Sequence, residues 1–435
     1  MRVRHLVTVA VLACARDSIR AQEASLMIQA IPMATRADPT ATRSALNEGY
    51  LTQPLFMGHG AWGPGRAVAT LNLEGWTLQR GELTTGAFGE GYVDRRHPHS
   101  YVHELLGGVE GARSGISASF FAGRGFVPFG SDDPMVRPFE KYPVNHHLAQ
   151  ILERIVAIGA VRRGPVILEL STFNGDEPVS PWTAPAWDRF GDSWSARLTA
   201  LPFRGAELSA SVADVASPEI RHGRGLDQWK RSVVARFDRM TSNTWRYALA
   251  EWAHTDERTQ GQTIVSLSSL LAEGAYCRAG VVVGARIEQT DRPEEEQTLD
   301  PFRTPRPPID LSNLGISRWT TGTLMVSAPP IMYRAFSGRA FVEVARISVA
   351  PGDPPGLFNA ELRYGSSHMW MLSGGVRLRV GSMHGQMGRY GVANPADSLP
   401  SSGTHMHEME SHQMTSSQPM TSSPPLFTPG SRCSL

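Results

Sequence analysis

Methionine and histidine residues recur at short spacings near the C-terminal end of the sequence. A methionine thioether suits Cu(I), and a histidine imidazole suits both Cu(I) and Cu(II). Ser, Pro and Gly dominate residues 382–435, so we expect a disordered tail there that can wrap a copper ion. A low-complexity linker with incidental Met and His is the alternative. The candidate ligands are Met383, His384, Met387, His405, Met406, His407, Met409, His412 and Met414.

A second group of polar residues lies further toward the N-terminus. Mixtures of histidine and carboxylate can hold zinc or copper, but a polar network inside the fold is the interpretation we favour over a metal site or catalysis. Pro98 disrupts strand pairing, so His97 and His99 should lie where a strand begins. Adjacent His146 and His147 would point opposite ways on a strand, which favours a loop anchor. The whole group is Asp94, His97, His99, His103, Glu104, His146 and His147.

Composition and motifs exclude several common functions. The chain has 42 basic and 41 acidic side chains, so no overall field favours nucleic acid as a partner. It contains no Gly-x-Ser-x-Gly, His-Glu-x-x-His, phosphate-binding loop or Cys-x-x-Cys. We therefore assign no catalytic residues, expect no enzymatic activity and expect no required cofactor.

The first 21 residues have the pattern of a secretory signal peptide. A basic start precedes an apolar run from Leu6 to Ala15, and polar residues follow. A buried N-terminal helix is the alternative, and Val11–Cys14 loosely resembles a lipoprotein cleavage box. No apolar stretch reaches the roughly 18 residues of a transmembrane helix. Cys14 would be removed with the signal, and Cys277 and Cys433 alone predict no disulfide framework.

The middle of the chain consists of short, evenly spaced blocks in which apolar and polar residues alternate. In Val166–Leu170, for example, Val166, Leu168 and Leu170 share one face and Ile167 and Glu169 the other. Strands of this kind suit a membrane β-barrel with lipid outside and water inside, although a soluble β-sandwich gives a similar local pattern. The candidate strands are 66–77, 99–111, 113–123, 149–161, 164–174, 193–203, 205–215, 228–239, 243–254, 262–272, 276–289, 315–327, 335–349 and 369–381.

These blocks predict an all-β fold, an antiparallel outer-membrane-type β-barrel of about fourteen strands (range 12–16) over residues 66–381. Residues 22–65 would be a periplasmic lead-in, and the even strand number would place both termini in the periplasm. Long insertions, including residues 124–147, would form loops at the opposite end, and the first of these would fold inward as a constriction. Arginines opposite apolar faces should line the pore and favour anions: Arg197, Arg236, Arg377 and Arg379.

Several motifs together resemble a family of little-characterised bacterial outer-membrane β-barrel proteins associated with copper and heavy-metal efflux systems. The resemblance covers residues 55–390 and implies outer-membrane lipid, metal ions and an efflux system as partners. The matching segments, in order, are Phe56–Gly60, Gly91–His99, Pro143–His147, Phe173–Pro178 and Ser382–Met387.

We therefore predict a porin-like channel or a metal-handling protein of the outer membrane. Two alternatives stay open. One is a secreted soluble β-protein whose His/Asp metal site makes it a hydrolase. The other is a structural barrel with a plugged lumen that conducts nothing.

Overall fold

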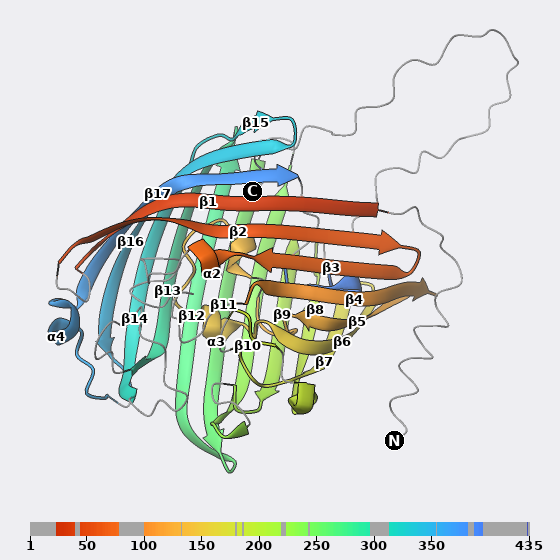
Figure 1. The fold of residues 1–435 in the computed structure, drawn as a ribbon, viewed down its shortest axis with the longest axis horizontal. Coiled ribbons are helices and arrows are strands. Elements are labelled where there is room, and N and C mark those ends of the chain that lie inside the picture. The colour runs from red at the N-terminus through yellow and green to blue at the C-terminus, as the bar shows by residue number, and fades with distance from the viewer. Residues whose placement is uncertain are drawn as a thin grey trace, which may run out of the picture.

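The computed structural model describes residues 23–39, 44–77, 100–131, 133–178, 181–184, 187–218, 223–241, 244–295, 313–353, 355–381, 387–394 and 433. In this part of the chain one antiparallel sheet closes on itself as a barrel (Figure 1). Each strand pairs with the next along the sequence, except at the short β15, where β14 pairs with β16, and the last strand, β17, pairs with the first, β1. No described helix is long and apolar enough to cross a membrane.

The strands are β1 (Glu23–Asp38), β2 (Leu46–Trp62), β3 (Gly65–Asn72), β4 (Val102–Arg113), β5 (Ile116–Gly125), β6 (Arg154–Arg163), β7 (Val166–Phe173), β8 (Ser193–Ala200), β9 (Ala206–Val215), β10 (Asp227–Met240), β11 (Thr244–Thr259), β12 (Gln262–Arg278), β13 (Val281–Glu295), β14 (Asn313–Ser327), β15 (Ile331–Tyr333), β16 (Phe336–Pro351) and β17 (His368–Gly381). The short helices are α2 (Glu74–Thr77), η1 (Pro134–Val136), α3 (His146–Ala149), η2 (Trp187–Arg189), α4 (Ala360–Tyr364) and η4 (Gly391–Ala393).

The closed ring has sixteen strands in the described part of the chain, because β15 is a short strand that pairs only with β16 and the sheet counts seventeen in all. Every one of the fourteen predicted segments overlaps a strand of this ring. The prediction of an outer-membrane-type barrel is confirmed, and its count of about fourteen is corrected to sixteen.

The two strands that the sequence did not reveal are β1 and β2, which occupy the predicted lead-in of residues 22–65. Proline explains the error, since it lacks the N–H that a strand ladder needs. Pro32 lies where the pairing of β1 with β17 is interrupted, between Ala30 and Met33. A bulge in the pairing of β1 with β2 lies beside it, between Gln29 and Ile31. The lead-in is therefore part of the barrel wall.

Alternation along each strand separates an outer from an inner face. On β7, Val166, Leu168 and Leu170 are 45%, 44% and 53% exposed, whereas Ile167 and Glu169 are fully buried. Large apolar side chains recur on outward positions around the ring, and the Trp194 and Trp229 rings meet at 5.9 Å on the same outer face. Such an apolar belt has lipid as its natural surroundings, so the barrel spans an outer membrane. Outward examples on other strands are Leu198, Leu208, Leu270, Ile287, Leu324, Val342 and Leu372.

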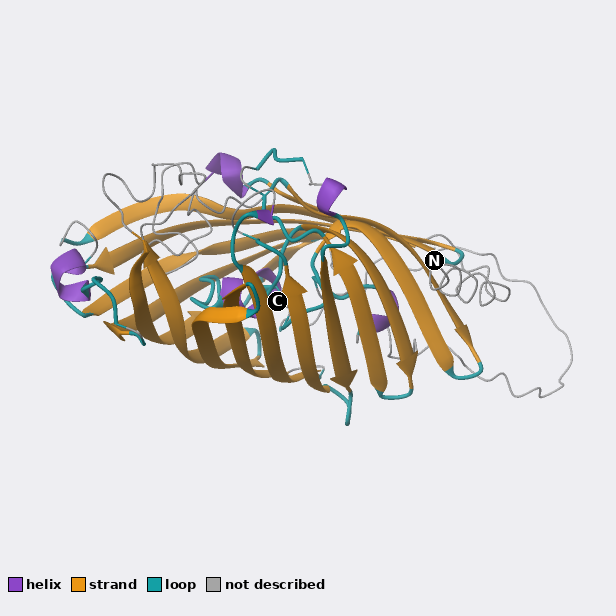
Figure 2. Cartoon of the chain, turned by 90° about the horizontal axis from the view of Figure 1, so that it is seen from below, coloured by secondary structure: helices purple, strands orange, loops and turns teal. Residues whose placement is uncertain are grey.

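The two ends of the barrel differ in their connections. Short turns such as Ser114–Gly115 and Ala279–Gly280, with positive φ at both residues, join strands at one end. The start of β1 and the end of β17 lie at that end, since Met27 pairs with Gly381. The tilted strands are seen from below in Figure 2. Long loops gather at the other end, which is the extracellular end in outer-membrane barrels.

Candidate functional site

The inner face of the barrel carries many buried charges. A buried charge is costly unless it is paired or hydrogen-bonded, so each needs a partner inside the barrel. Two stretches of chain inside the barrel supply most of these partners. We name them the lumen loop (residues 126–153, between β5 and β6) and the tail segment (residues 387–394, after β17). The inward charges include Glu104, Glu169, Arg197, Glu207, Glu251, Glu273, Arg286, Glu288, Arg339, Glu343 and Arg377.

Local signals shape the lumen loop. The Asp133 carboxylate accepts a hydrogen bond of 2.8 Å from the Met135 N–H, and Pro134 follows Asp133, so η1 begins with both a cap and a proline. Further along, the N–H groups of Leu148 and Ala149 both donate to the Asn145 carbonyl at 2.9 Å, which forms α3. The Asn145 amide in turn donates to Glu251 on β11 at 2.8 Å. The predicted inward fold of this long insertion is thus what the structure shows.

Two carboxylates fix the loop to the wall: Glu140 on the loop and Glu343 on β16. Arg377 on β17 donates to Glu140 Oε2 from Nε at 3.0 Å and from Nη2 at 2.6 Å. Glu343 on β16 accepts from the backbone N–H of Glu140 at 2.6 Å and of Lys141 at 3.2 Å. These two backbone donors satisfy part of the hydrogen-bonding capacity of the buried Glu343 carboxylate.

Arg137 links the loop to the opposite part of the wall. Its guanidinium lies 3.7 Å from Glu251 on β11 and 3.8 Å from Glu273 on β12. Burial alone would lower the pKa of Arg137, but the facing carboxylates of Glu273 and Glu251 raise it above its ordinary value. Arg137 therefore stays charged and holds two acidic wall positions together.

Lys141 is a buried titratable group of the loop. Its Nζ lies 3.0 Å from Tyr50 Oη on β2 and 5.5 Å from the centre of the same ring. Burial lowers the pKa of Lys141 from 10.5 to about 7, although Glu343 and Glu48 oppose that shift. This amine can therefore gain or lose its proton near neutral pH.

A small cavity lies between the loop and the wall formed by β13, β14, β16 and β17, and charged, polar and apolar side chains line it. The hydroxyls of Thr321 and Thr323 lie at this cavity, and neither has a hydrogen-bond partner within the described part of the chain. Buried hydroxyls without a protein partner need water, and the cavity has room for about one molecule. The lining residues are Lys141, Tyr142, Val144, Arg286, Glu288, Thr321, Thr323, Glu343, Ala345, Met371 and Ser373.

The tail segment occupies the other side of the lumen, against β4 to β9. Arg389 lies against two wall carboxylates: its Nη1 is 3.4 Å from Glu169 on β7, and its Nη2 donates to Glu207 on β9. It also donates to the Thr199 hydroxyl at 3.2 Å. Its side chain is only 1% exposed, so water contributes almost nothing to its solvation.

The two inward stretches meet at Tyr390. Its Oη donates to Glu104 on β4 at 2.7 Å and accepts from the Phe126 N–H of the lumen loop at 3.0 Å. Met387 packs beside Phe126 and Met135 of the same loop. The loop and the tail segment therefore divide the lumen between them.

The predicted histidine and carboxylate group is only partly within the described residues. His103 Nδ1 lies 2.7 Å from Glu153, and its Nε2 accepts from the Asn72 amide at 2.6 Å. Glu104 accepts from Thr70 at 2.6 Å as well as from Tyr390. No cluster of three or more possible metal ligands occurs among the residues that the structure describes. His103 and Glu104 thus belong to a polar network.

The rest of that group is less completely placed. Asp94, His97 and His99 lie outside the described residues. His146 and His147 form the start of α3, which is a helix and not a strand, and their side chains are not described.

The four arginines predicted to line the pore all face the interior. Each donates a hydrogen bond to a neighbouring side chain. A role of these arginines in conduction stays a prediction. Their contacts are Arg197 with Glu169 at 2.6 Å, Arg236 with Asp238 at 3.1 Å, Arg377 with Glu140 at 2.6 Å and Arg379 with the Gln29 amide oxygen at 2.6 Å.

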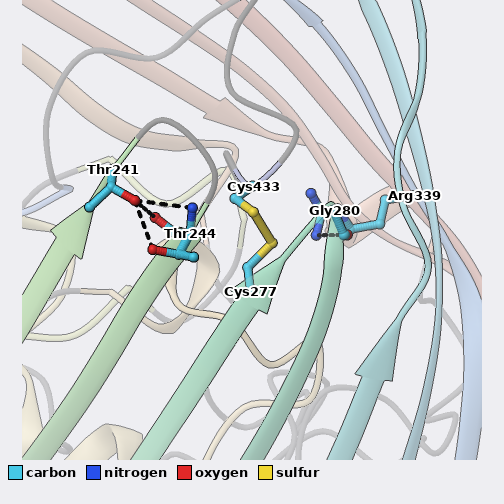
Figure 3. The surroundings of a disulfide bond; sticks show 6 residues. All are labelled: Thr241, Thr244, Cys277, Gly280, Arg339 and Cys433. Atoms are coloured by element: carbon cyan, nitrogen blue, oxygen red, sulfur yellow. Dashed lines mark hydrogen bonds between the residues drawn. A yellow bond between two sulfur atoms is a disulfide. The ribbon is translucent and has the colours of Figure 1, made fainter.

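The tail prediction needs two corrections. Met387, expected as a copper ligand in a disordered tail, is 3% exposed in an apolar cluster inside the barrel. Cys433 forms a disulfide with Cys277 on β12, although the sequence predicted no disulfide framework. Figure 3 shows this bond beside Thr241, Thr244 and the contact of Arg339 with the Gly280 carbonyl. Outside the described residues lie Met383, His384, His405, Met406, His407, Met409, His412 and Met414.

Sequence reasoning named Arg197, Arg377, His103 and Glu104, but it missed several of their partners inside the barrel. Glu169 stood on the polar face of a clearly alternating strand, a signal that could have marked it as inward. Glu140 and Arg389 gave no such signal, because they lie in irregular segments far from their partners along the chain. Glu140 and Arg377, for example, are 237 residues apart.

No protein-family model and no curated protein matches this chain. Among solved structures, an anion-selective porin from Comamonas acidovorans is similar, with 9% identity over 83% of this chain and 100% of that one, and a TM-score of 0.49. The trimer form of in-vitro folded OmpT, an outer-membrane protein of Vibrio cholerae, has 8% identity over 83% and 100%, and a TM-score of 0.47. Salmonella typhi OmpF in complex with daunomycin has 10% identity over 82% and 97%, and a TM-score of 0.46.

These likenesses are too distant to carry an argument, so the class rests on the geometry of the chain itself. A closed ring of sixteen antiparallel strands, an apolar outer belt and a charged interior entered by a long loop define an outer-membrane β-barrel of porin-like architecture.

Proposed function

We propose that this protein is a channel for small ions, with its passage between the lumen loop and the wall of β13, β14, β16 and β17. The cavity at this place, with the charged and hydroxyl side chains that line it, carries the proposal. The Thr321 and Thr323 hydroxyls have no hydrogen-bond partner among the residues that the structure describes, so we expect water there, inside a barrel whose outer face is apolar. A hydrated gap lined by both signs of charge is the arrangement from which an ion pathway is built. The proposal assigns the protein transport and no catalysis.

Charges of both signs line the passage, so its selectivity depends on their balance. Lys141, Arg286, Glu288 and Glu343 all line the cavity, and Arg286 lies 3.6 Å from Glu288 on the same strand. Because Lys141 titrates near pH 7, the passage should favour anions more strongly in mild acid, where the amine is charged.

Planar-bilayer recordings on the purified protein test this proposal. We expect discrete conductance steps whose reversal potential in a salt gradient shifts toward cations in Arg286→Gln and toward anions in Glu288→Gln. Arg346→Gln is the matched control, because Arg346 lies on the outer face of β16 over Trp370. Equal shifts in the control, or none in the two variants, would place the ion path elsewhere.

The set Arg197, Arg236, Arg377 and Arg379 provides a second test of the same function. If these inward arginines contribute to selectivity, replacing them by Gln one at a time should shift the reversal potential toward cations. Unchanged selectivity in all four would confine them to structural pairing.

A plugged structural barrel is the second candidate, and one observation favours it. The lumen side chains of the described residues are mostly buried, and the cavity has room for about one water molecule. Absence of conductance in the full chain and in every variant with an altered lumen would establish this alternative.

Copper binding by the tail is a separate proposal, supported by its residue types. Met406, Met409 and Met414 would hold Cu(I), while neighbouring histidines would hold Cu(II) and release it as the pH falls through about 6.5. A synthetic peptide of residues 400–420 can be titrated with each oxidation state. Affinity no greater than that of a peptide with Leu for Met and Gln for His would reduce the tail to a linker.

A further inference from the structure

The tail segment fills a place in the lumen without being part of the barrel wall. Every wall strand from β4 to β9 is hydrogen-bonded to a wall strand on each side, and none of these ladders involves residues 387–394. The segment follows the last strand, which ends at Gly381. The ring is therefore complete before the segment is added.

Charge complementarity holds the segment in place. The wall presents Glu169 and Glu207, with Arg197 bonded to the first of them at 2.6 Å. Arg389 inserts between the two carboxylates, and the Gly388 carbonyl accepts from Arg197 at 3.3 Å. Without Arg389, this part of the wall would expose more negative than positive charge to the lumen.

Close packing continues along the rest of the segment. Gly391 has φ +55° and lies so near the wall that a Cβ would come within 2.7 Å of Phe121 and Ser119. Ala393 is fully buried and packs with Ala160 on β6 and Ile167 on β7. The segment thus excludes water from the wall that it covers.

A covalent tether lies further along the same tail. Cys433 is bonded to Cys277, which faces inward near the end of β12 where the short turn to β13 follows. A segment that left its place would therefore remain attached to the barrel at both sides, through β17 and through this disulfide.

We propose that residues 387–394 are a tethered plug that closes a second passage along β4 to β9, and that the passage prefers cations once the plug is displaced. This inference rests on the proposed channel function. Displacement removes the Arg389 guanidinium and leaves Glu104, Glu169 and Glu207 facing the lumen with Arg197, while the charge of Arg154 on β6 is paired with Glu177 at 3.0 Å. An excess of inward carboxylates favours cations in a narrow pore.

The variant Arg389→Glu tests the plug directly, because it places a carboxylate against Glu169 and Glu207. We expect its conductance to rise roughly threefold or more, with the reversal potential shifted toward cations. The charge exchange Arg389→Glu with Glu207→Arg should restore the low conductance. Arg113→Glu is the matched control, since Arg113 is exposed beside the Ser114–Gly115 turn, and it should behave as the unmodified protein.

A labelling experiment shows whether the plug has moved. Ala393→Cys is introduced with the native cysteines changed to Ser, and its reaction with a membrane-impermeant maleimide is timed. The thiol should react slowly with Arg389 present and at least about tenfold faster in Arg389→Glu, because position 393 is covered only while the segment is docked. Fast labelling without any rise in conductance would overturn the proposal.

Residues 387–394 could stay docked even in Arg389→Glu. A truncated chain that ends at Gly381 lacks the segment altogether and tests the proposal in that case. Heat-modifiable mobility in detergent first confirms that its barrel is folded. Higher, cation-preferring conductance in this truncated chain supports the plug. Conductance in both chains with equal size and selectivity overturns the plug and leaves the channel function standing. No conductance in either chain would contradict both the proposed channel function and the proposed plug.

Discussion

The lumen loop and the tail segment both fill the lumen and pair with inward charges of the wall, on opposite sides of the barrel. They are attached to the barrel differently. The loop continues into β5 and β6 at its two ends and makes polar contacts with β2, β9, β11, β12, β13, β16 and β17. The tail segment is joined to the ring through β17 on one side and, further along the chain, through the Cys277–Cys433 disulfide on the other. It makes polar contacts with β4, β5, β7, β8 and β9 and with the lumen loop.

The difference indicates which half of the lumen can change. Moving the loop would leave several buried charges without partners. It would also strain β5 and β6, the wall strands to which the loop is joined. Moving the tail segment leaves every ladder of the wall intact, so its displacement needs only the free energy of docking. One half of the lumen is therefore fixed and the other releasable.

The largest effect should come from breaking the main anchor of the loop. Arg377→Met leaves the Glu140 carboxylate buried without its cation, and we expect the free energy of unfolding to fall by about 3–5 kcal/mol. Urea unfolding in detergent, followed by tryptophan fluorescence, measures the loss. Arg379→Met is the matched variant: Arg379 bonds the neutral Gln29 amide, and its loss should be clearly smaller. Equal losses in the two variants would mean that the Arg377–Glu140 ion pair stabilises the fold no more than the Arg379–Gln29 hydrogen bond.

Breaking the corresponding pair in the tail segment should cost less. Arg389→Met can relieve the unpaired carboxylates by releasing the segment, so we expect the barrel to lose only about 1–2 kcal/mol. The same urea titration gives the value, and limited proteolysis shows whether the segment has left its place. A loss as large as that of Arg377→Met, with the segment still protected, would make the tail an integral part of the barrel and would end the contrast.

A pH dependence should distinguish the loop further. Lys141 has a folded pKa of about 7 against an ordinary value of 10.5, so between these limits the unfolded state binds the proton and the folded state does not. Stability from this group therefore rises as the pH increases from about 7 to about 10, by at most about 1.4 kcal/mol per unit. Urea titrations at several pH values should lose this slope in Lys141→Met. Arg389→Met removes no amine and should keep it.

An effect about as small as that of Arg389→Met should come from the bond that joins the two regions. Tyr390→Phe removes the hydroxyl that bridges Glu104 and Phe126, and we expect a loss of about 1–2 kcal/mol in the docking of the segment. The Ala393→Cys labelling rate reports it. Tyr333→Phe, at a side chain that is 66% exposed, provides the control. No change in rate would mean that the two regions are independent of each other.

Local pattern was enough to predict most of the wall. Alternation over a strand is imposed by the two environments on its faces, so it is written in the sequence of each segment separately. Glu169 between Leu168 and Leu170 is an example, and Arg197 opposite it on β8 is another. Where proline and glycine interrupt the pattern, as around Pro32 and Pro54, the local signal does not predict strands, and the predicted lead-in is in fact β1 and β2.

By itself, the sequence determined an exported, all-β, outer-membrane-type barrel and the inward direction of Arg197, Arg236, Arg377 and Arg379. Only the tertiary structure decided what fills the barrel. The pairs Arg377 with Glu140, Arg389 with Glu207 and Cys277 with Cys433 join residues separated by 237, 182 and 156 positions. Such partners leave no periodic trace, because the contact depends on where closure of the ring brings each side chain and not on its neighbours along the chain.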